Sequence, residues 1–150
     1  MKVLFLDIDG VLNSDKWMYE RNKNERYKFL PYPMCEFDPE CVKRLNRILK
    51  ETNAKLVVSS DWRFTKGLDS IFFAVDIESE IYDTTPLVFK GIRGQEIALW
   101  LKNHPEFTKY VILDDNAEFL KKQKPFLVRT QYAEGLTDEL AEKAIQILND

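Results

Sequence analysis

Two aspartates, one residue apart, follow a short apolar run at the start of the chain. Asp7 and Asp9 come after Val3–Leu6, and Gly10 follows them directly. A short, continuous apolar run is typical of a strand buried on both faces in a parallel sheet. Carboxylates at the end of such a strand are costly unless a cation or hydrogen-bond donors compensate their charge. The pattern therefore predicts a divalent cation at this strand end, although aspartates also cap loops and helices.

Polar side chains also end two further apolar runs. Ser59 follows Lys55–Val58, and two adjacent aspartates, Asp114 and Asp115, follow the third run. The carboxyl ends of parallel strands meet at one edge of a sheet, where α/β proteins bind their ligands. We therefore expect these side chains to lie beside the first pair of aspartates, despite their separation in sequence.

The expected cluster suits magnesium-dependent attack on a phosphomonoester. Asp7 and Asp114, with Asp115 as a further candidate, offer the hard oxygen ligands that Mg²⁺ prefers, and Mg²⁺ in turn neutralises phosphoryl oxygens. Asp7 is the expected nucleophile and would form an aspartyl-phosphate. Asp9 would protonate the leaving oxygen and then deprotonate the water that hydrolyses the intermediate. The Ser59 hydroxyl and a nearby cation would bind the remaining phosphate oxygens.

The elements that position these residues alternate between strands and helices, which is typical of βαβ units and a parallel sheet. The expected strands are Lys2–Leu6, Lys55–Val58, Tyr110–Leu113 and Pro125–Val128. The expected helices begin at Asp38-Pro39, cover residues 68–75, include Ile97–Leu101 before His104, and span Asp138–Leu148 with Thr137 as the cap. We expect a turn-rich connection at Asp83–Pro86 and one α/β domain over residues 1–150.

The segment Ser14–Phe37 is too long for an ordinary connection between a strand and its helix. Aromatic and basic residues alternate along it: Lys16, Trp17, Tyr19, Arg21, Lys23, Arg26, Tyr27, Lys28, Phe29 and Tyr32. Its place after the first strand predicts a flap above the active site. The alternative is a solvated excursion whose aromatic side chains cover the domain.

Bulk composition excludes some classes of function. The net charge is −3, so no overall basic field favours nucleic acid, although a local basic patch remains compatible with this value. Cys35 and Cys41 do not form a Cys-x-x-Cys motif, and we expect reduced thiols rather than a zinc site. No apolar stretch approaches the ~18 residues that span a bilayer, and no charged leader precedes the first strand. We expect a cytoplasmic protein without membrane contact or an obligate protein partner.

Three segments of the chain resemble motifs of the haloacid dehalogenase (HAD) superfamily. Asp7–Asn13 resembles its first motif, Val57–Ser59 its second and Ile112–Asp115 its acidic fourth, so the resemblance covers about residues 1–130. It implies a Rossmann-like three-layer fold with a central, mainly parallel sheet, obligatory Mg²⁺ and phosphomonoester chemistry through Asp7. It also implies that the backbone carbonyl of Asp9 binds the metal, and that a small flap at about 14–37 replaces a large cap domain.

The third motif of the superfamily is a lysine or arginine near the start of the helix that precedes the acidic strand. Arg93 and Lys90 both fit this description as the cation that binds the substrate phosphate. Arg93 is preferred because it stands at the expected start of the helix. The choice between the two stays open at the level of sequence.

The resemblance also narrows the class of reaction. Superfamily members that displace halide lack the acid at the position of Asp9, so its presence favours a phosphatase. Ser59–Arg63 resembles the second-motif region of nucleic-acid end-repair phosphatases. Within that segment, Trp62 is expected in the core and Arg63 beside a structural acid, rather than on substrate.

Three functions remain open. Without a large cap, the site could admit a polynucleotide end, with Trp17, Tyr19 and Tyr27 stacking on bases and with Lys23, Arg26 and Lys28 near phosphates. The flap could instead close over a small phosphorylated molecule. A non-catalytic HAD-fold module that only binds metal or a partner is the third alternative, and the intact set of motif residues counts against it.

Overall fold

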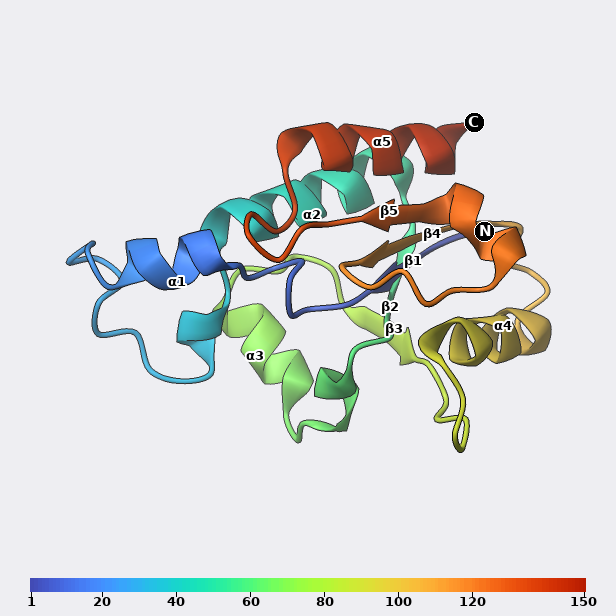
Figure 1. Ribbon diagram of the computed structural model, residues 1–150, viewed down its shortest axis with the longest axis horizontal. Coiled ribbons are helices and arrows are strands. Elements are labelled where there is room, and N and C mark those ends of the chain that lie inside the picture. Colours follow the sequence, from blue (N-terminus) through green and yellow to red (C-terminus); the bar gives the residue numbers. More distant parts are fainter.

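The computed structural model describes residues 1–150 and shows a single parallel sheet between layers of helices (Figure 1). Every neighbouring pair of strands is parallel, and the spatial order is β3-β2-β1-β4-β5. The strands are β1 (Lys2–Leu6), β2 (Lys55–Val58), β3 (Ile81–Thr84), β4 (Lys109–Asp114) and β5 (Leu127–Arg129). The expected Rossmann-like α/β fold of three layers is confirmed, and the sheet is wholly rather than mainly parallel.

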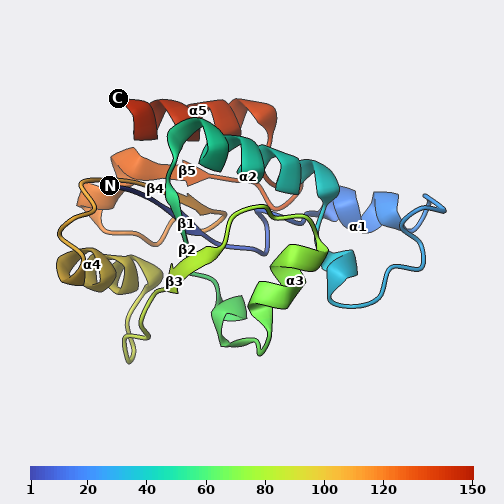
Figure 2. The same cartoon turned by 180° about the vertical axis from the view of Figure 1, so that it is seen from behind.

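Helices cover both faces of the sheet. Helices α2 and α5 lie side by side on one face, while α4 covers the other, as both views of the ribbon show (Figures 1 and 2). The helices are α1 (Asp15–Arg21), α2 (Pro39–Thr52), α3 (Leu68–Ala74), α4 (Arg93–Asn103) and α5 (Asp138–Asn149). Short 3-10 helices occupy Met34–Glu36, Asp61–Phe64 and Lys121–Phe126. No helix is both long enough and apolar enough to traverse a bilayer.

The central strand β1 is buried on both faces, as its continuous apolar run predicts. Leu4 and Leu6 belong to the larger apolar cluster, which includes buried residues of α2 and α5. Val3 and Phe5 belong to the smaller cluster, which includes Trp100 of α4. Because side chains alternate along a strand, this division places the two sets on opposite faces of the sheet. Trp100 is a core residue, as its place on the apolar face of the helix predicts.

Local capping explains where two of the helices begin. Asp38 accepts a hydrogen bond from the backbone N–H of Glu40 at the start of α2, where Pro39 takes the first helical position. Thr137 accepts one from the N–H of Leu140 at the start of α5. Both caps satisfy N–H groups that have no partner within the helix, and both agree with the sequence pattern.

The predicted turn at 83–86 is wrong, because residues 81–84 form the edge strand β3. Aspartate and threonine in succession suggest a turn, but pairing with β2 and a bond between the Trp100 indole N–H and Asp83, at 2.8 Å, stabilise an extended backbone. The last strand is also shifted, since Pro125 lies in a 3-10 helix and β5 begins at Leu127. Proline has no N–H to donate to a sheet, which explains this later start.

The segment 14–37, which we call the insert, contains α1 and lies beyond the carboxyl ends of the strands (Figure 1). Trp17 is only 2% exposed, and its indole N–H donates to the carbonyl of Cys35 at 2.8 Å. The ring of Tyr27 packs edge-on against it. Stacking of Trp17 on a nucleic-acid base is therefore a wrong prediction, because this ring belongs to the small core of the insert. Tyr19, at 63% exposed, remains accessible.

Candidate active site

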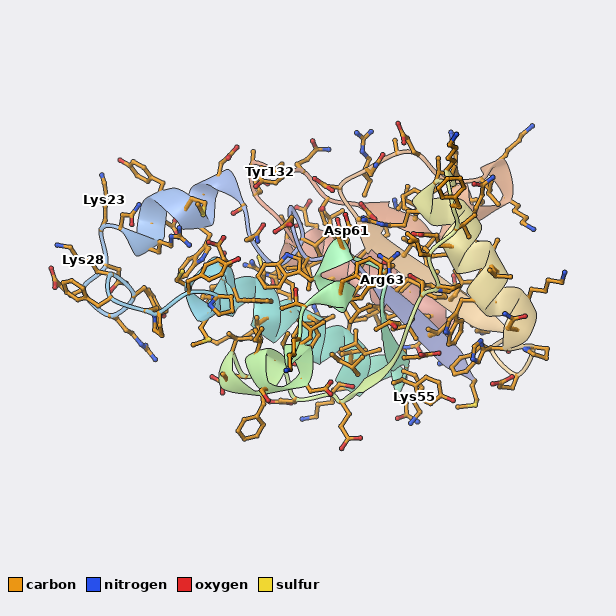
Figure 3. All side chains as sticks on the ribbon, turned by 90° about the horizontal axis from the view of Figure 1, so that it is seen from below. Lys23, Lys28, Lys55, Asp61, Arg63 and Tyr132 are labelled. Carbon is orange, nitrogen blue, oxygen red and sulfur yellow. The ribbon has the colours of Figure 1, made fainter.

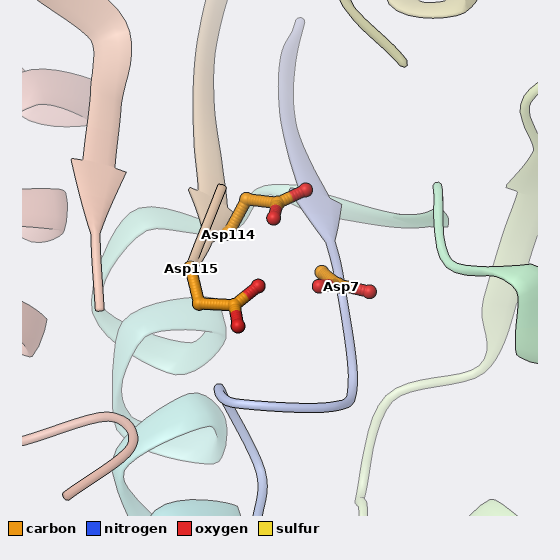
Figure 4. A group of neighbouring side chains, drawn as sticks. All are labelled: Asp7, Asp114 and Asp115. Carbon is orange, nitrogen blue, oxygen red and sulfur yellow. The ribbon is translucent and has the colours of Figure 1, made fainter. Parts of the chain in front are cut away.

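Three carboxylates from two neighbouring strands converge at one edge of the sheet. Asp7 follows β1 directly, and its backbone N–H donates to the carbonyl of Leu113 at 2.9 Å, which holds it beside the end of β4. Asp114 is the last residue of β4, and Asp115 follows it. One oxygen atom from each of the three side chains lies within 4.8 Å of the other two, and the carboxylates face a common space (Figure 4). Adjacent parallel strands thus bring these residues together.

The electrostatics of this cluster favour a bound cation. Asp7 is 5% exposed and Asp114 is fully buried. Burial raises the pKa of Asp7 to about 8, and the neighbouring Asp114 adds to the rise, while Arg93 opposes it. Burial and Asp114 also raise the pKa of Asp115. Three hard oxygen donors that repel one another match the ligand preference of Mg²⁺, so the residues present fit this ion.

Arg93 reaches this cluster, whereas Lys90 does not. The Nη1 atom of Arg93, the first residue of α4, lies 3.2 Å from Asp7 Oδ1 and 2.9 Å from Asp114 Oδ2. Lys90 is exposed, and its ammonium lies over the ring of Phe89, 5.5 Å from the centroid. The geometry therefore places Arg93, and not Lys90, at the carboxylate cluster.

Two buried hydroxyls near the strand ends have no hydrogen-bond partner. Ser59 follows β2, its backbone N–H donates to Leu6, and its Oγ is buried and unpaired. Thr85 follows β3, and its Oγ1 is likewise buried and unpaired. A buried polar group without a partner is unfavourable, so each hydroxyl is available to a ligand oxygen. The sequence motif marks Ser59 for this role, while nothing in the sequence marks Thr85.

Asp9 lies outside the three-carboxylate cluster and is held by two donors. It is exposed; Asn13 Nδ2 donates to its Oδ1 at 2.9 Å, and Trp62 Nε1 donates to its Oδ2 at 3.2 Å. Trp62 is half-buried, with its ring packed edge-on against Phe37 at 5.3 Å between centroids. Trp62 thus packs on the core and also orients the expected proton donor. Sequence separation hides this second contact, because Trp62 is far from Asp9 along the chain.

Arg63 is a buried structural cation. Its side chain is 2% exposed, and its Nη2 lies 3.1 Å from Glu96 Oε2. It also donates to the carbonyls of Ser59, Ser60 and Thr85. These contacts tie the loops after β2 and β3 to α4, and they agree with the expectation that Arg63 pairs with a structural acid.

Gly10 is required by both its backbone and its surroundings. Its φ is +81°, and a Cβ at this position would stand 2.5 Å from Asp115 Oδ2. A residue with a Cβ in the left-handed conformation costs about 1–2 kcal/mol. We expect Gly10→Ala to lower the free energy of unfolding by more than this amount, because Asp115 must also move. Gly67→Ala is the matched control, since its φ is +77° and nothing lies within 4 Å. Urea denaturation measures both losses, and equal losses would contradict a tight fit at Asp115.

Binding of Mg²⁺ should depend on pH because of Asp7. Its pKa of about 8 means that the metal-free carboxyl is protonated at pH 6 and must lose this proton before it binds a cation. The affinity for Mg²⁺ should therefore fall, by up to about tenfold per pH unit, as the pH drops below this value. In the metal-free protein, the stabilisation from protonated Asp7 is lost as the pH rises through about 8. Calorimetric titration with Mg²⁺ at pH 6 and pH 8 tests the predicted change in affinity, and equal affinities at the two pH values would contradict it.

A known protein family matches residues 3–141 of the chain, a range that includes every residue of the site. Searches of curated proteins and of solved structures gave no match. The matched region contains the three converging carboxylates and all five strands except the first residue of β1. The chain thus belongs to the family described as the HAD domain in Swiss Army Knife RNA repair proteins.

Proposed function

We propose that this protein is a Mg²⁺-dependent phosphomonoesterase that forms an aspartyl-phosphate on Asp7 and acts on phosphorylated RNA ends. Its membership of a HAD family implies a phosphoesterase-type function, and the family description names RNA repair. The observation that carries the proposal is the convergence of Asp7, Asp114 and Asp115, with Arg93 in contact with the first two. Phosphoryl transfer needs such a combination of nucleophile, metal ligands and cation.

Asp7 and Asp9 divide the chemistry between them. A carboxylate oxygen of Asp7 attacks phosphorus, the bond from phosphorus to the leaving oxygen breaks, and Asp9 gives that oxygen its proton. Asp9 then takes a proton from the attacking water, which releases phosphate and restores the Asp7 carboxylate. The hydrogen bonds from Asn13 and Trp62 hold Asp9 for both proton transfers.

Charged and polar groups around the two aspartates hold the phosphoryl group. Asp7, Asp114 and Asp115 would hold Mg²⁺, which would neutralise charge on the phosphoryl oxygens, and the family resemblance implies that the backbone carbonyl of Asp9 would be a further ligand. Arg93 carries more N–H groups than its contacts with the acids use, and these can donate to phosphoryl oxygens. The unpaired hydroxyl of Ser59 can donate to a further oxygen.

The exposed surface supports an RNA end as the substrate. Lys23 and Lys28 lie at the far end of the insert, away from Asp61 and Arg63 (Figure 3). Residues 16–28 of the insert have five basic and two acidic side chains. Such a segment suits the phosphates of a strand that extends beyond the site.

Turnover of a substrate panel tests the proposal. The panel contains 3′- and 5′-phosphorylated RNA oligonucleotides, a nucleoside monophosphate and a sugar phosphate, each with and without Mg²⁺. We expect Mg²⁺-dependent release of phosphate, with the highest kcat/KM for an oligonucleotide, and a lower value after charge reversal at Arg26 and Lys28. Preference for the sugar phosphate would favour a small-molecule phosphatase. A stable complex without any turnover would favour a binding module.

A further inference from the structure

An open groove of about 520 Å³ begins at Asp9 and runs between the insert and the loop after β2. Tyr32 and Glu36 of the insert line one part of it, and Asp61 and Trp62 line the other. Its volume is within the range of sites for small organic ligands. The three metal-binding aspartates are not part of its lining, so the groove is a separate compartment beside the reaction centre.

The position of Asp9 decides which part of a substrate the groove would receive. In the proposed reaction, Asp9 gives its proton to the oxygen that leaves phosphorus. The alcohol that carries this oxygen must therefore lie next to Asp9, while the phosphoryl group lies over Asp7. For a phosphorylated RNA end, that alcohol is the ribose of the terminal nucleoside.

The groove offers aromatic surface for a base. Tyr32 is 74% exposed, so its ring is accessible to a ligand in the groove. Trp62 is fixed by its hydrogen bond to Asp9 and by its edge-on packing against Phe37. Stacking of a base on an aromatic side chain contributes about 1–3 kcal/mol and tolerates any base.

The charges of the groove favour a nucleoside over a run of phosphates. Glu36 and Asp61 contribute carboxylates beside Asp9, which carries the proton for the leaving oxygen, and no lining residue is basic. Arg21 lies 3.5 Å from Glu36, while Arg63 and Arg93 lie 3.5 Å and 4.0 Å from Asp61. These arginines compensate part of the negative charge, but none of them lines the groove. Ionised carboxylates accept hydrogen bonds from ribose hydroxyls and base amino groups but repel phosphate.

We infer that this groove binds the terminal nucleoside of the phosphorylated RNA end, with its base stacked on Tyr32. The inference rests on the proposed function. Because the groove lining holds acidic and no basic side chains, the next phosphate of the strand is expected to lie outside it. The exposed basic residues of the insert lie outside the groove lining, where phosphates further along the strand could meet them.

Binding to a catalytically silent protein tests the groove without relying on turnover. The probe is a short end-phosphorylated RNA, titrated against Asp7→Asn protein in the presence of Mg²⁺. We expect Tyr32→Ala to weaken binding by about tenfold, whereas Tyr32→Phe, which keeps the ring, should stay within about twofold. Phe73→Ala is the control, because Phe73 is an 83% exposed aromatic on α3 that does not line the groove.

A second probe with an abasic terminal nucleotide isolates the stacking contact. If the base stacks on Tyr32, the effect of Tyr32→Ala disappears with this probe. Equal loss with both probes, or no loss with either, would overturn the inference even if the enzyme is an active phosphatase. If Tyr32→Ala weakens binding only when the base is present, but the protein has no phosphatase activity, the inference about the groove stands and the proposed function is refuted.

Discussion

Asp7→Asn should lower kcat for phosphate release by at least about 1,000-fold, because loss of a covalent nucleophile removes the whole chemical route. The substitution is nearly isosteric but removes the charge that attacks phosphorus and binds the metal. It also removes a buried carboxylate whose pKa is raised to about 8, so the metal-free variant should be at least as stable as the native protein at high pH. Steady-state turnover of an aryl phosphate, with circular dichroism and urea denaturation, measures both effects.

Asp69→Asn is the control for Asp7→Asn, since Asp69 is exposed on α3 and does not belong to the three-carboxylate cluster. It should turn over substrate at the native rate. Residual activity of Asp7→Asn above a few per cent would show that another group attacks phosphorus, or that the measured activity belongs to a contaminant.

Arg93→Ala should lower kcat/KM by about 100-fold or more, while Lys90→Ala should change it by less than about twofold. Arg93 lies 2.9 Å from Asp114 and 3.2 Å from Asp7, so it is placed to neutralise charge on a phosphoryl group between them. Lys90 lies over Phe89 and makes no ion pair with these aspartates. Arg93→Lys should recover only part of the loss, because an ammonium keeps the charge but not the paired donors.

These variants decide whether Arg93 or Lys90 binds the substrate phosphate, a choice that the sequence alone leaves open. A large loss in Lys90→Ala together with a small loss in Arg93→Ala would contradict the geometry. Binding of inorganic phosphate by the same proteins separates substrate binding from chemistry, since Arg93→Ala should weaken it as well.

Sequence pattern predicts this fold well where the residues of a pattern are neighbours in the chain. The apolar run of β1, the caps at Asp38 and Thr137 and the polar ends of β1, β2 and β4 are all local features. The strand β3 escapes prediction because pairing with β2 stabilises it more than its own residues do. Trp17 escapes for a similar reason, since its burial depends on Cys35 and Tyr27.

The residues of the site also differ in whether the local sequence predicts them. Residues that follow strands directly can be predicted, because strand ends in a parallel sheet share one edge. The Trp62 donor to Asp9 and the unpaired hydroxyl of Thr85 depend on how the loops after β2 and β3 fold back, with Arg63 holding both loops. Such contacts need the three-dimensional structure, because neither composition nor spacing encodes which loop atoms meet.

The stereochemical course at phosphorus tests the central claim most directly. The substrate is a phosphorothioate monoester made chiral at phosphorus with two oxygen isotopes, hydrolysed in water that carries the third isotope, and the configuration of the released chiral thiophosphate is determined. Attack by Asp7 followed by attack of water inverts phosphorus twice, so we predict overall retention of configuration. Inversion would mean that water attacks the ester directly and that no aspartyl-phosphate forms on Asp7.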